Sequence, residues 1–267
     1  MPQKPRLGQN FLVDAEAVER IVTGLGAGLG DLAGRTVVEI GPGRGALTAA
    51  LAARAGRVVA IELDRELAAG LRRRFDPERV NIVEQDVLQF DFAAAAAEAG
   101  ERLRVVGNLP YYITSPILLR LAAHHAALDV GVLMVQREVA ERVTAAPGSR
   151  EYGLLSVTVQ MYGPAETLFT LPPSAFSPPP QVHSTVFRWR FAPRFAELGV
   201  DEGGFLRFLR QVFAQKRKTL ANNLRAAGVA PGFAAATFAS VGISAQARAE
   251  AVPVEALAML WRELKKE

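Results

Sequence analysis

Short apolar runs rich in valine and isoleucine alternate, through the first half of the chain, with segments whose apolar residues recur at helical spacing. This pattern predicts strands over 35–41, 57–64, 80–86, 102–108 and 130–136, and helices over 15–25, 65–75 and 116–125. The alanine-rich stretch 93–100 fits a helix or a solvated connection. Because strands that alternate with helices form parallel sheets covered on both faces, we expect an α/β fold with a doubly wound, Rossmann-like sheet.

The predicted secondary-structure pattern changes twice in the second half of the chain. Residues 164–171 and 184–191 predict an antiparallel strand pair at the sheet edge, on either side of the proline-rich segment 172–183. From about residue 192 the pattern is helical only, and it includes a continuous helical stretch over 201–228. We therefore expect an α/β domain over 1–190 and a small all-helical domain over 191–267.

Composition narrows the class of protein. Half of the 267 residues are apolar, which is enough for one large core and a smaller second one. The chain has no cysteine and only three histidines, His124, His125 and His183, so we expect no metal site. The N-terminus lacks an apolar signal core and no segment approaches the roughly 18 apolar residues of a membrane span, which predicts a cytoplasmic protein. The pI of about 9.7 and net charge of +4 favour, weakly, a polyanionic partner.

The sequence EIGPGRGALT at 39–48 follows a predicted strand and opens a helix. Gly41, Gly43 and Gly45 allow a sharp turn and let a ligand approach the main chain closely. Glu62 closes the next strand, where a carboxylate can accept hydrogen bonds from ribose hydroxyls. These features fit a dinucleotide-dependent dehydrogenase, a methyltransferase or a purely structural turn. The spacing G-x-G-x-G, in place of G-x-G-x-x-G, favours S-adenosylmethionine, whose nucleoside needs no pyrophosphate seat.

Two further polar residues, Asp86 and Asn108, stand at the ends of predicted strands. Ligands bind outside the carboxyl ends of parallel strands, so we expect both at one rim with Glu62. Asp86 can accept a hydrogen bond from the adenine amino group of a cofactor, or it can simply cap a turn.

The stretch NLPY at 108–111 carries the strongest chemical signal. The Asn108 side-chain oxygen and the Leu109 carbonyl are two acceptors in a turn stiffened by Pro110, which suits an exocyclic amine with two hydrogens. Drawing those hydrogens out of the purine plane would turn the nitrogen lone pair toward a sulfonium methyl group. Tyr111 offers a face on which a flipped-out base can stack. The alternative is a turn with an asparagine cap and core tyrosines.

These motifs resemble the ribosomal RNA adenine N6,N6-dimethyltransferase family, and closely its bacterial small-subunit (16S) branch. Segments that match the family in order are LGQNFL at 7–12, EIGPGRGALT at 39–48, IELD at 61–64, EQD at 84–86, NLPY at 108–111, FSPPPQVHS at 176–184 and QKRKTLANNL at 215–224. Together they cover almost the whole chain. The chain departs from the family pattern at Tyr112, Gln181 and His183, where we expect an effect on the loops more than on the chemistry.

The resemblance implies a class I methyltransferase that uses S-adenosylmethionine to dimethylate two adjacent adenosines. The substrate would be the 3′-terminal hairpin loop of 16S rRNA within an immature 30S subunit, and the enzyme a monomer. The implied cofactor contacts are Gln9, Asn10, Leu12, Gly41, Gly43, Glu62, Leu63, Asp86, Val87 and Asn108. The resemblance also implies that Phe176 packs on the target adenine opposite Tyr111.

Cations concentrate in the C-terminal part of the chain. Between residues 204 and 225 there are six and no acidic residue: Arg207, Arg210, Lys216, Arg217, Lys218 and Arg225. Such a face can neutralise RNA phosphates, although a merely solvated helix face fits the charge equally well. The consecutive cations at 216–218 would spread around a helix. Lys4 and Arg6 can add an N-terminal arm that orders over the cofactor.

Other functions stay open at this point. A 23S rRNA adenine N6-methyltransferase of the macrolide-resistance type is the nearest, although its tetrapeptide usually carries Ile where Leu109 stands. A non-catalytic ribosome assembly factor is a second, and a dehydrogenase a distant third. The intact set of Glu62, Asp86 and NLPY argues against a protein that only binds.

Overall fold

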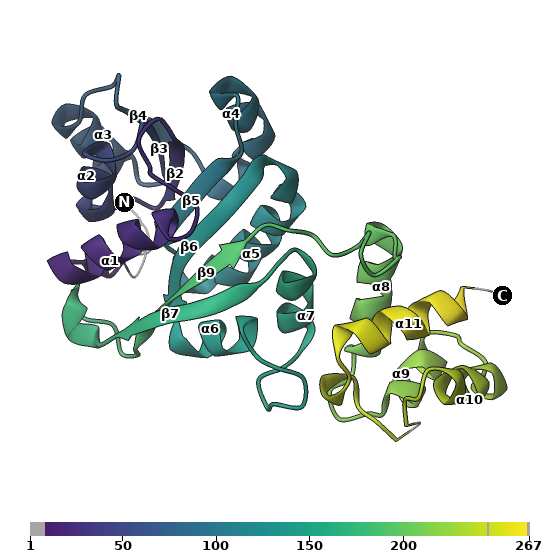
Figure 1. Cartoon of the computed structure of the whole chain (residues 1–267). Coiled ribbons are helices and arrows are strands. Elements are labelled where there is room, and N and C mark those ends of the chain that lie inside the picture. The colour runs from purple at the N-terminus through teal and green to yellow at the C-terminus, as the bar shows by residue number, and fades with distance from the viewer. Residues whose placement is uncertain (1–8, 245, 266–267) are drawn as a thin grey trace, which may run out of the picture. The chain divides into compact units, whose positions relative to one another are not determined.

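The computed structural model describes residues 9–244 and 246–265, which form two compact units (Figure 1). The first unit runs to Ala140 and resumes with Ala165–Phe191, and the second comprises Glu141–Pro164 and the chain from Ala192 onward. The second unit thus resumes close to the boundary expected near residue 190. It differs from the sequence-based division because residues 141–164 also belong to it, through a helix that packs against the C-terminal helices.

Seven strands of the described residues form one mixed sheet in the first unit. Their spatial order is β4 (Val80–Glu84), β3 (Arg57–Glu62), β2 (Thr36–Ile40), β5 (Leu103–Asn108), β6 (Leu128–Gln136), β9 (Ser184–Arg190) and β7 (Ala165–Leu171). The first five are mutually parallel, whereas β9 pairs antiparallel with both β6 and β7. The predicted parallel sheet and its antiparallel edge pair are confirmed.

Helices cover both faces of this sheet, as the alternating pattern predicted (Figure 1). One face carries α1 (Ala15–Gly26), α2 (Ala46–Ala52) and α3 (Arg65–Arg74), and the other α4 (Phe92–Ala99) and α5 (Thr114–Ala123). Asp14 caps α1 as expected, because its carboxylate accepts from the Ala17 amide at 3.0 Å. The central strands are nearly continuous apolar runs buried on both sides, which is why their sequences do not alternate.

A second, two-stranded sheet joins segments far apart in the sequence. β1 (Phe11–Leu12) pairs antiparallel with β8 (Phe176–Ser177), and Leu12 stands opposite Phe176. The Val13 amide continues the contact by donating to the Ala175 carbonyl at 2.9 Å. This pairing fixes the N-terminal segment of the described chain against the main sheet's hydrophobic core.

The second unit is helical. Its helices are α7 (Leu154–Met161), α8 (Glu202–Val212), α9 (Leu220–Ala226), α10 (Pro231–Ser240) and α11 (Val254–Leu264), and α6 (Arg137–Val143) crosses the division between the units. No helix in the described part of the chain is long and apolar enough to cross a membrane.

The prediction of one continuous helical stretch over 201–228 is wrong in one respect. Residues 213–219 form a loop between α8 and α9. The Asn223 side chain donates to the carbonyls of Val212 at 2.8 Å and Gln215 at 3.3 Å. Thr219 caps the start of α9. These side-chain bonds satisfy backbone groups that a continuing helix would have used, so the chain turns here.

Candidate active site

A cavity opens at the carboxyl ends of four neighbouring strands of the first unit, β4, β3, β2 and β5. It lies where the strand order reverses, the usual ligand position in an open parallel sheet. All residues predicted to contact a cofactor line it: Gln9, Asn10, Leu12, Gly41, Gly43, Glu62, Leu63, Asp86, Val87 and Asn108. Leu109, Pro110 and Tyr111 of the predicted catalytic set also line it.

The glycine loop after β2 forms one wall of the cavity. Gly41 and Gly43 have φ angles of +67° and +57°, a left-handed backbone that L side chains rarely adopt. A Cβ on Gly43 would lie 2.9 Å from the ring of Phe11, so a larger residue would collide with β1. The guanidinium carbon of Arg44 lies 4.4 Å from the centre of the same ring, within cation–π distance. The loop and β1 therefore close this side of the cavity together.

Glu62, at the end of β3, connects the glycine loop to the next strand. Its side chain is buried, and its two carboxylate oxygens accept from the backbone amides of Gly43 at 3.0 Å and Asp64 at 2.9 Å. Burial raises the pKa of Glu62, and these amide donors oppose the rise. The carboxylate is thus held in place at the cavity wall, where its remaining lone pairs can accept from ligand hydroxyls.

A second buried carboxyl group, Glu39 of β2, lines the cavity and was not among the predicted site residues. Its side chain is 1% exposed and accepts from the Thr48 hydroxyl at 2.6 Å. Burial raises the pKa of Glu39 to about 7, with a further contribution from the charge of Glu62. The available signal was an acidic residue inside the apolar run VVEI, because a carboxyl group in a buried strand needs a polar partner.

Asp86 caps a turn and also lines the cavity. Its Oδ1 accepts from the Leu88 amide at 2.9 Å and so begins the short 3-10 helix Val87–Gln89. The cap occupies one carboxylate oxygen, and the contact of Asp86 with an adenine amino group stays a prediction. Leu63, at the same rim, is 52% exposed and offers apolar surface.

The amide of Asn108 is oriented by a residue almost a hundred positions away. Its Nδ2 donates to the backbone carbonyl of Asn10 at 2.9 Å. Because a carbonyl can only accept, this contact decides which end of the amide faces Asn10 and leaves the oxygen as the end that can accept elsewhere. The next residue is held as well, since the Leu109 amide donates to the Met134 carbonyl at 2.9 Å.

The aromatic residues predicted to hold a base are placed differently from one another. Tyr111 is half-buried at the cavity, and its hydroxyl lies 2.7 Å from the Ser184 hydroxyl, which fixes the ring. Burial raises the pKa of the Tyr111 hydroxyl. Phe176 is 3% exposed in the hydrophobic core, because the β1–β8 pairing buries it opposite Leu12. Phe176, unlike Tyr111, does not line the cavity, and its stacking on a base stays a prediction.

The model of the family described as ribosomal RNA adenine dimethylase matches residues 2–266. The chain belongs to this family. It is also 59% identical, over 263 residues, to the protein named ribosomal RNA small subunit methyltransferase A of Acidobacterium capsulatum, covering 98% of this chain and 91% of that one. Membership makes the chain a methyltransferase and confirms the resemblance drawn from its motifs.

Two solved structures share the fold of this dimethylase. A dimethyladenosine transferase from Plasmodium falciparum superposes with a TM-score of 0.79 at 21% identity, covering 96% of this chain and 98% of that one. The 23S rRNA methyltransferase ErmE superposes with a TM-score of 0.73 at 23% identity, covering 96% of this chain and 100% of that one. Both are related to this chain by fold, which confirms the expected Rossmann-like methyltransferase sheet.

The predicted RNA-binding cations of the dimethylase that lie within the described residues are all on the surface of the second unit. Arg207 and Arg210 are on α8, Arg225 is on α9, and Lys216, Arg217 and Lys218 are in the loop 213–219. Lys4 and Arg6 lie outside the described residues.

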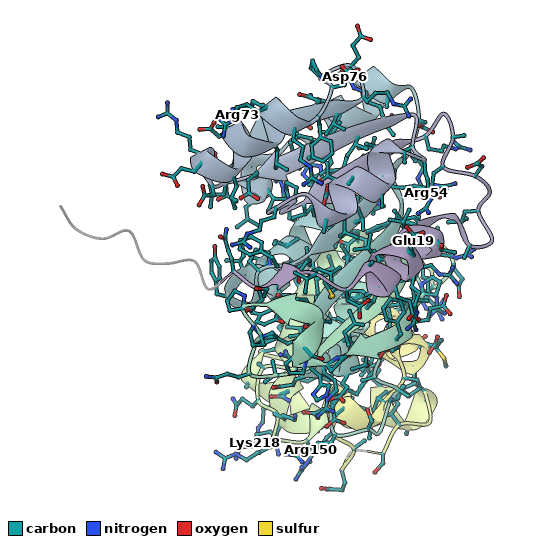
Figure 2. The ribbon with its side chains drawn as sticks, turned by 90° about the vertical axis from the view of Figure 1, so that its left-hand side faces the viewer. Glu19, Arg54, Arg73, Asp76, Arg150 and Lys218 are labelled. Carbon is teal, nitrogen blue, oxygen red and sulfur yellow. The ribbon has the colours of Figure 1, made fainter. Side chains whose placement is uncertain are left out.

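A further cation, Arg150, lies beside these residues and was not among the predicted RNA-binding cations. The Lys216 ammonium donates to the Arg150 carbonyl at 3.3 Å, and Figure 2 shows Arg150 and Lys218 extending from the same end of the unit.

Within the described ranges 9–244 and 246–265, no three acidic or histidine side chains are arranged to hold a metal ion.

Proposed function

We propose that this methyltransferase uses S-adenosylmethionine to dimethylate the N6 amino groups of two adjacent adenosines in the 3′-terminal hairpin loop of 16S rRNA, in an immature 30S subunit in the cytoplasm. The main support for this reaction is the orientation of the Asn108 amide, whose nitrogen is held by the Asn10 carbonyl at the rim of the cavity. The relatives' small-subunit name supports the choice of RNA.

The residues of the cavity fit a cationic nucleoside. Two buried carboxyl groups, Glu39 and Glu62, face a space whose glycine wall leaves room for backbone approach. Glu62 would accept from the ribose hydroxyls and Asp86 from the adenine amino group, while Leu63 would pack on the adenine ring. S-adenosylmethionine, when bound, supplies a methyl group activated by a sulfonium.

The reaction needs an adenine nitrogen that can act as a nucleophile. The lone pair of an exocyclic amine is delocalised into the purine ring, so the free amine is a poor one. The Asn108 oxygen and the Leu109 carbonyl would each accept one of its hydrogens, which favours a tetrahedral nitrogen whose lone pair faces the methyl donor. Catalysis of this kind is positioning and local electrostatics. The proton lost after transfer can pass to water.

Tyr111 would hold the flipped-out adenine by stacking. Its ring is already fixed by the Ser184 contact, so little conformational entropy is lost when the base arrives. A stacked base is typically worth about 1–3 kcal/mol. The exposed cations of the second unit would bind phosphates, with affinity that falls steeply as salt rises.

The test is incubation of the full-length protein with 30S subunits that lack the modification, followed by mass spectrometry of the nucleosides. We expect dimethyladenosine to form with the wild type and not with Asn108→Ala, which should still bind subunits. Asn81→Ala is the matched control, because this asparagine is exposed on β4 and does not line the cavity. Full methylation by Asn108→Ala would refute the role of the amide. Primer extension on both rRNAs of a deletion strain would reveal a 23S target instead.

A further inference from the structure

Tyr112, which has no part in the proposed chemistry, presents an open aromatic ring at the mouth of the cavity. It lines the cavity and is 61% exposed. Large exposed hydrophobic residues are few in the described part of the chain, and Tyr112 is the only aromatic one among them. A ring left in water gains nothing from packing in the free protein, and its place at the mouth of a ligand cavity favours contact with a ligand.

The backbone separates Tyr112 from its neighbour. Tyr111–Ile113 forms a single turn of 3-10 helix, in which successive side chains point about 120° apart. Tyr111 is half-buried and tied to Ser184, whereas Tyr112 projects into solvent. One flipped-out base therefore cannot stack on both rings. The second ring is available to a different group at the same mouth.

We propose that Tyr112 is a stacking platform for the unpaired nucleobase that adjoins the adenosine in the cavity. This inference rests on the proposed function, in which the substrate has two adjacent adenosines in a loop. While one base occupies the cavity, its neighbour is one nucleotide away and has lost a stacking partner. The ring of Tyr112 replaces that partner and holds the strand splayed at the mouth. An aromatic face serves either neighbour, because stacking does not depend on base-specific hydrogen bonds.

The proposal predicts an effect on RNA that is separable from cofactor binding. Tyr112→Ala should weaken equilibrium binding of unmodified 30S subunits, measured by filter binding without S-adenosylmethionine, by about 5- to 150-fold, the range that corresponds to one stacked base. It should raise the KM for subunits by a similar factor. Tyr112→Phe keeps the ring and should stay within about twofold of the wild type by the same reasoning. Calorimetric affinity for S-adenosylmethionine should not change in either variant.

Leu119→Ala is the control for loss of exposed apolar surface, because Leu119 is 51% exposed on α5 and does not line the cavity. Subunits in which an abasic nucleotide replaces one of the two adenosines test the partner directly. The missing base should weaken binding to the wild type but not weaken binding to Tyr112→Ala any further, since the two changes remove the same contact.

Unchanged subunit binding by Tyr112→Ala would overturn the proposal. An equal loss of S-adenosylmethionine affinity would overturn it too, by making Tyr112 a cofactor contact, and so would an equal loss in Leu119→Ala. If the wild type binds subunits but never methylates them, the proposed function fails, while the binding comparison still decides the role of Tyr112.

Discussion

Replacing Glu39 by glutamine should remove a pH-dependent cost from the stability of the first unit. Burial raises the pKa of Glu39 from its ordinary value of 4.5 to about 7. Below pH 4.5 the carboxyl group is protonated in both the folded and the unfolded chain. As the pH rises from 4.5 to about 7, the unfolded chain releases this proton and the folded chain keeps it, so the free energy of unfolding falls. Above about pH 7 the loss is complete.

The size of the effect follows from the width of that interval. Each pH unit is worth about 1.4 kcal/mol, so Glu39 lowers the free energy of unfolding by about 3 kcal/mol between pH 4.5 and 7. A glutamine side chain at this position would have nearly the same shape and a carbonyl that can still accept from Thr48, but no proton to release. The stability of Glu39→Gln relative to the wild type should therefore rise by about 3 kcal/mol across this range.

Urea unfolding at several pH values from 4.5 to 8 measures this difference. The chain has two tryptophans, Trp189 in the first unit and Trp261 in the second, so a Trp261→Phe background makes the fluorescence report on the unit that contains Glu39. Groups that do not interact with Glu39 contribute equally to both proteins and cancel in the comparison, whereas Glu62 is coupled to Glu39 through its charge. Stability curves of the two proteins that stay parallel over the whole range would refute the reasoning.

Three other substitutions test separate parts of the structure. Arg104 is 2% exposed and donates to the Leu29 carbonyl at 2.6 Å among others, so Arg104→Met should lower the free energy of unfolding by about 3–5 kcal/mol in urea titrations. Arg44→Met removes the cation–π contact and should raise the dissociation constant of S-adenosylmethionine about two- to fivefold in calorimetry, with kcat unchanged. Replacing the cations 216–218 by glutamine should reduce the slope of log affinity for subunits against log salt by up to about 2–3, with cofactor affinity unchanged; an unaltered slope would remove that loop from the RNA interface.

The rim of the cavity could be predicted from the sequence because it depends on strand ends. Glu62, Asp86 and Asn108 each close an apolar run, and the carboxyl ends of parallel strands must meet at one edge. Glu39 was not predicted because it lies inside its strand. In a strand that is buried on both faces, the sequence does not show which side chains point toward a ligand cavity. Its role became visible only with the Thr48 hydroxyl and the cavity beside it.

Local pattern is a poor guide where tertiary contacts override it. The helix α7 has the sequence LLSVTVQM, whose β-branched residues favour a strand, yet it is helical and packs against α8. The loop 213–219 lies within a pattern that otherwise suits a continuous helix, and it is held open by Asn223, which donates back to two carbonyls. The partner of α7 lies far away in the sequence, whereas Asn223 lies in the same stretch as the loop and acts through side-chain bonds that a periodicity pattern does not show.

The orientation of the Asn108 amide shows the same dependence at the centre of the site. Its partner is the backbone carbonyl of Asn10, so the side chain at position 10 does not itself provide the contact. The orientation of the Asn108 amide therefore depends on the backbone path of the N-terminal segment, which places the Asn10 carbonyl. Phe11 packs on the bare face of Gly43, and Leu12 pairs with the buried Phe176. The buried Phe176 can thus support the orientation of the Asn108 amide from a distance, because the strand it pairs with follows directly after the Asn10 carbonyl that the amide contacts.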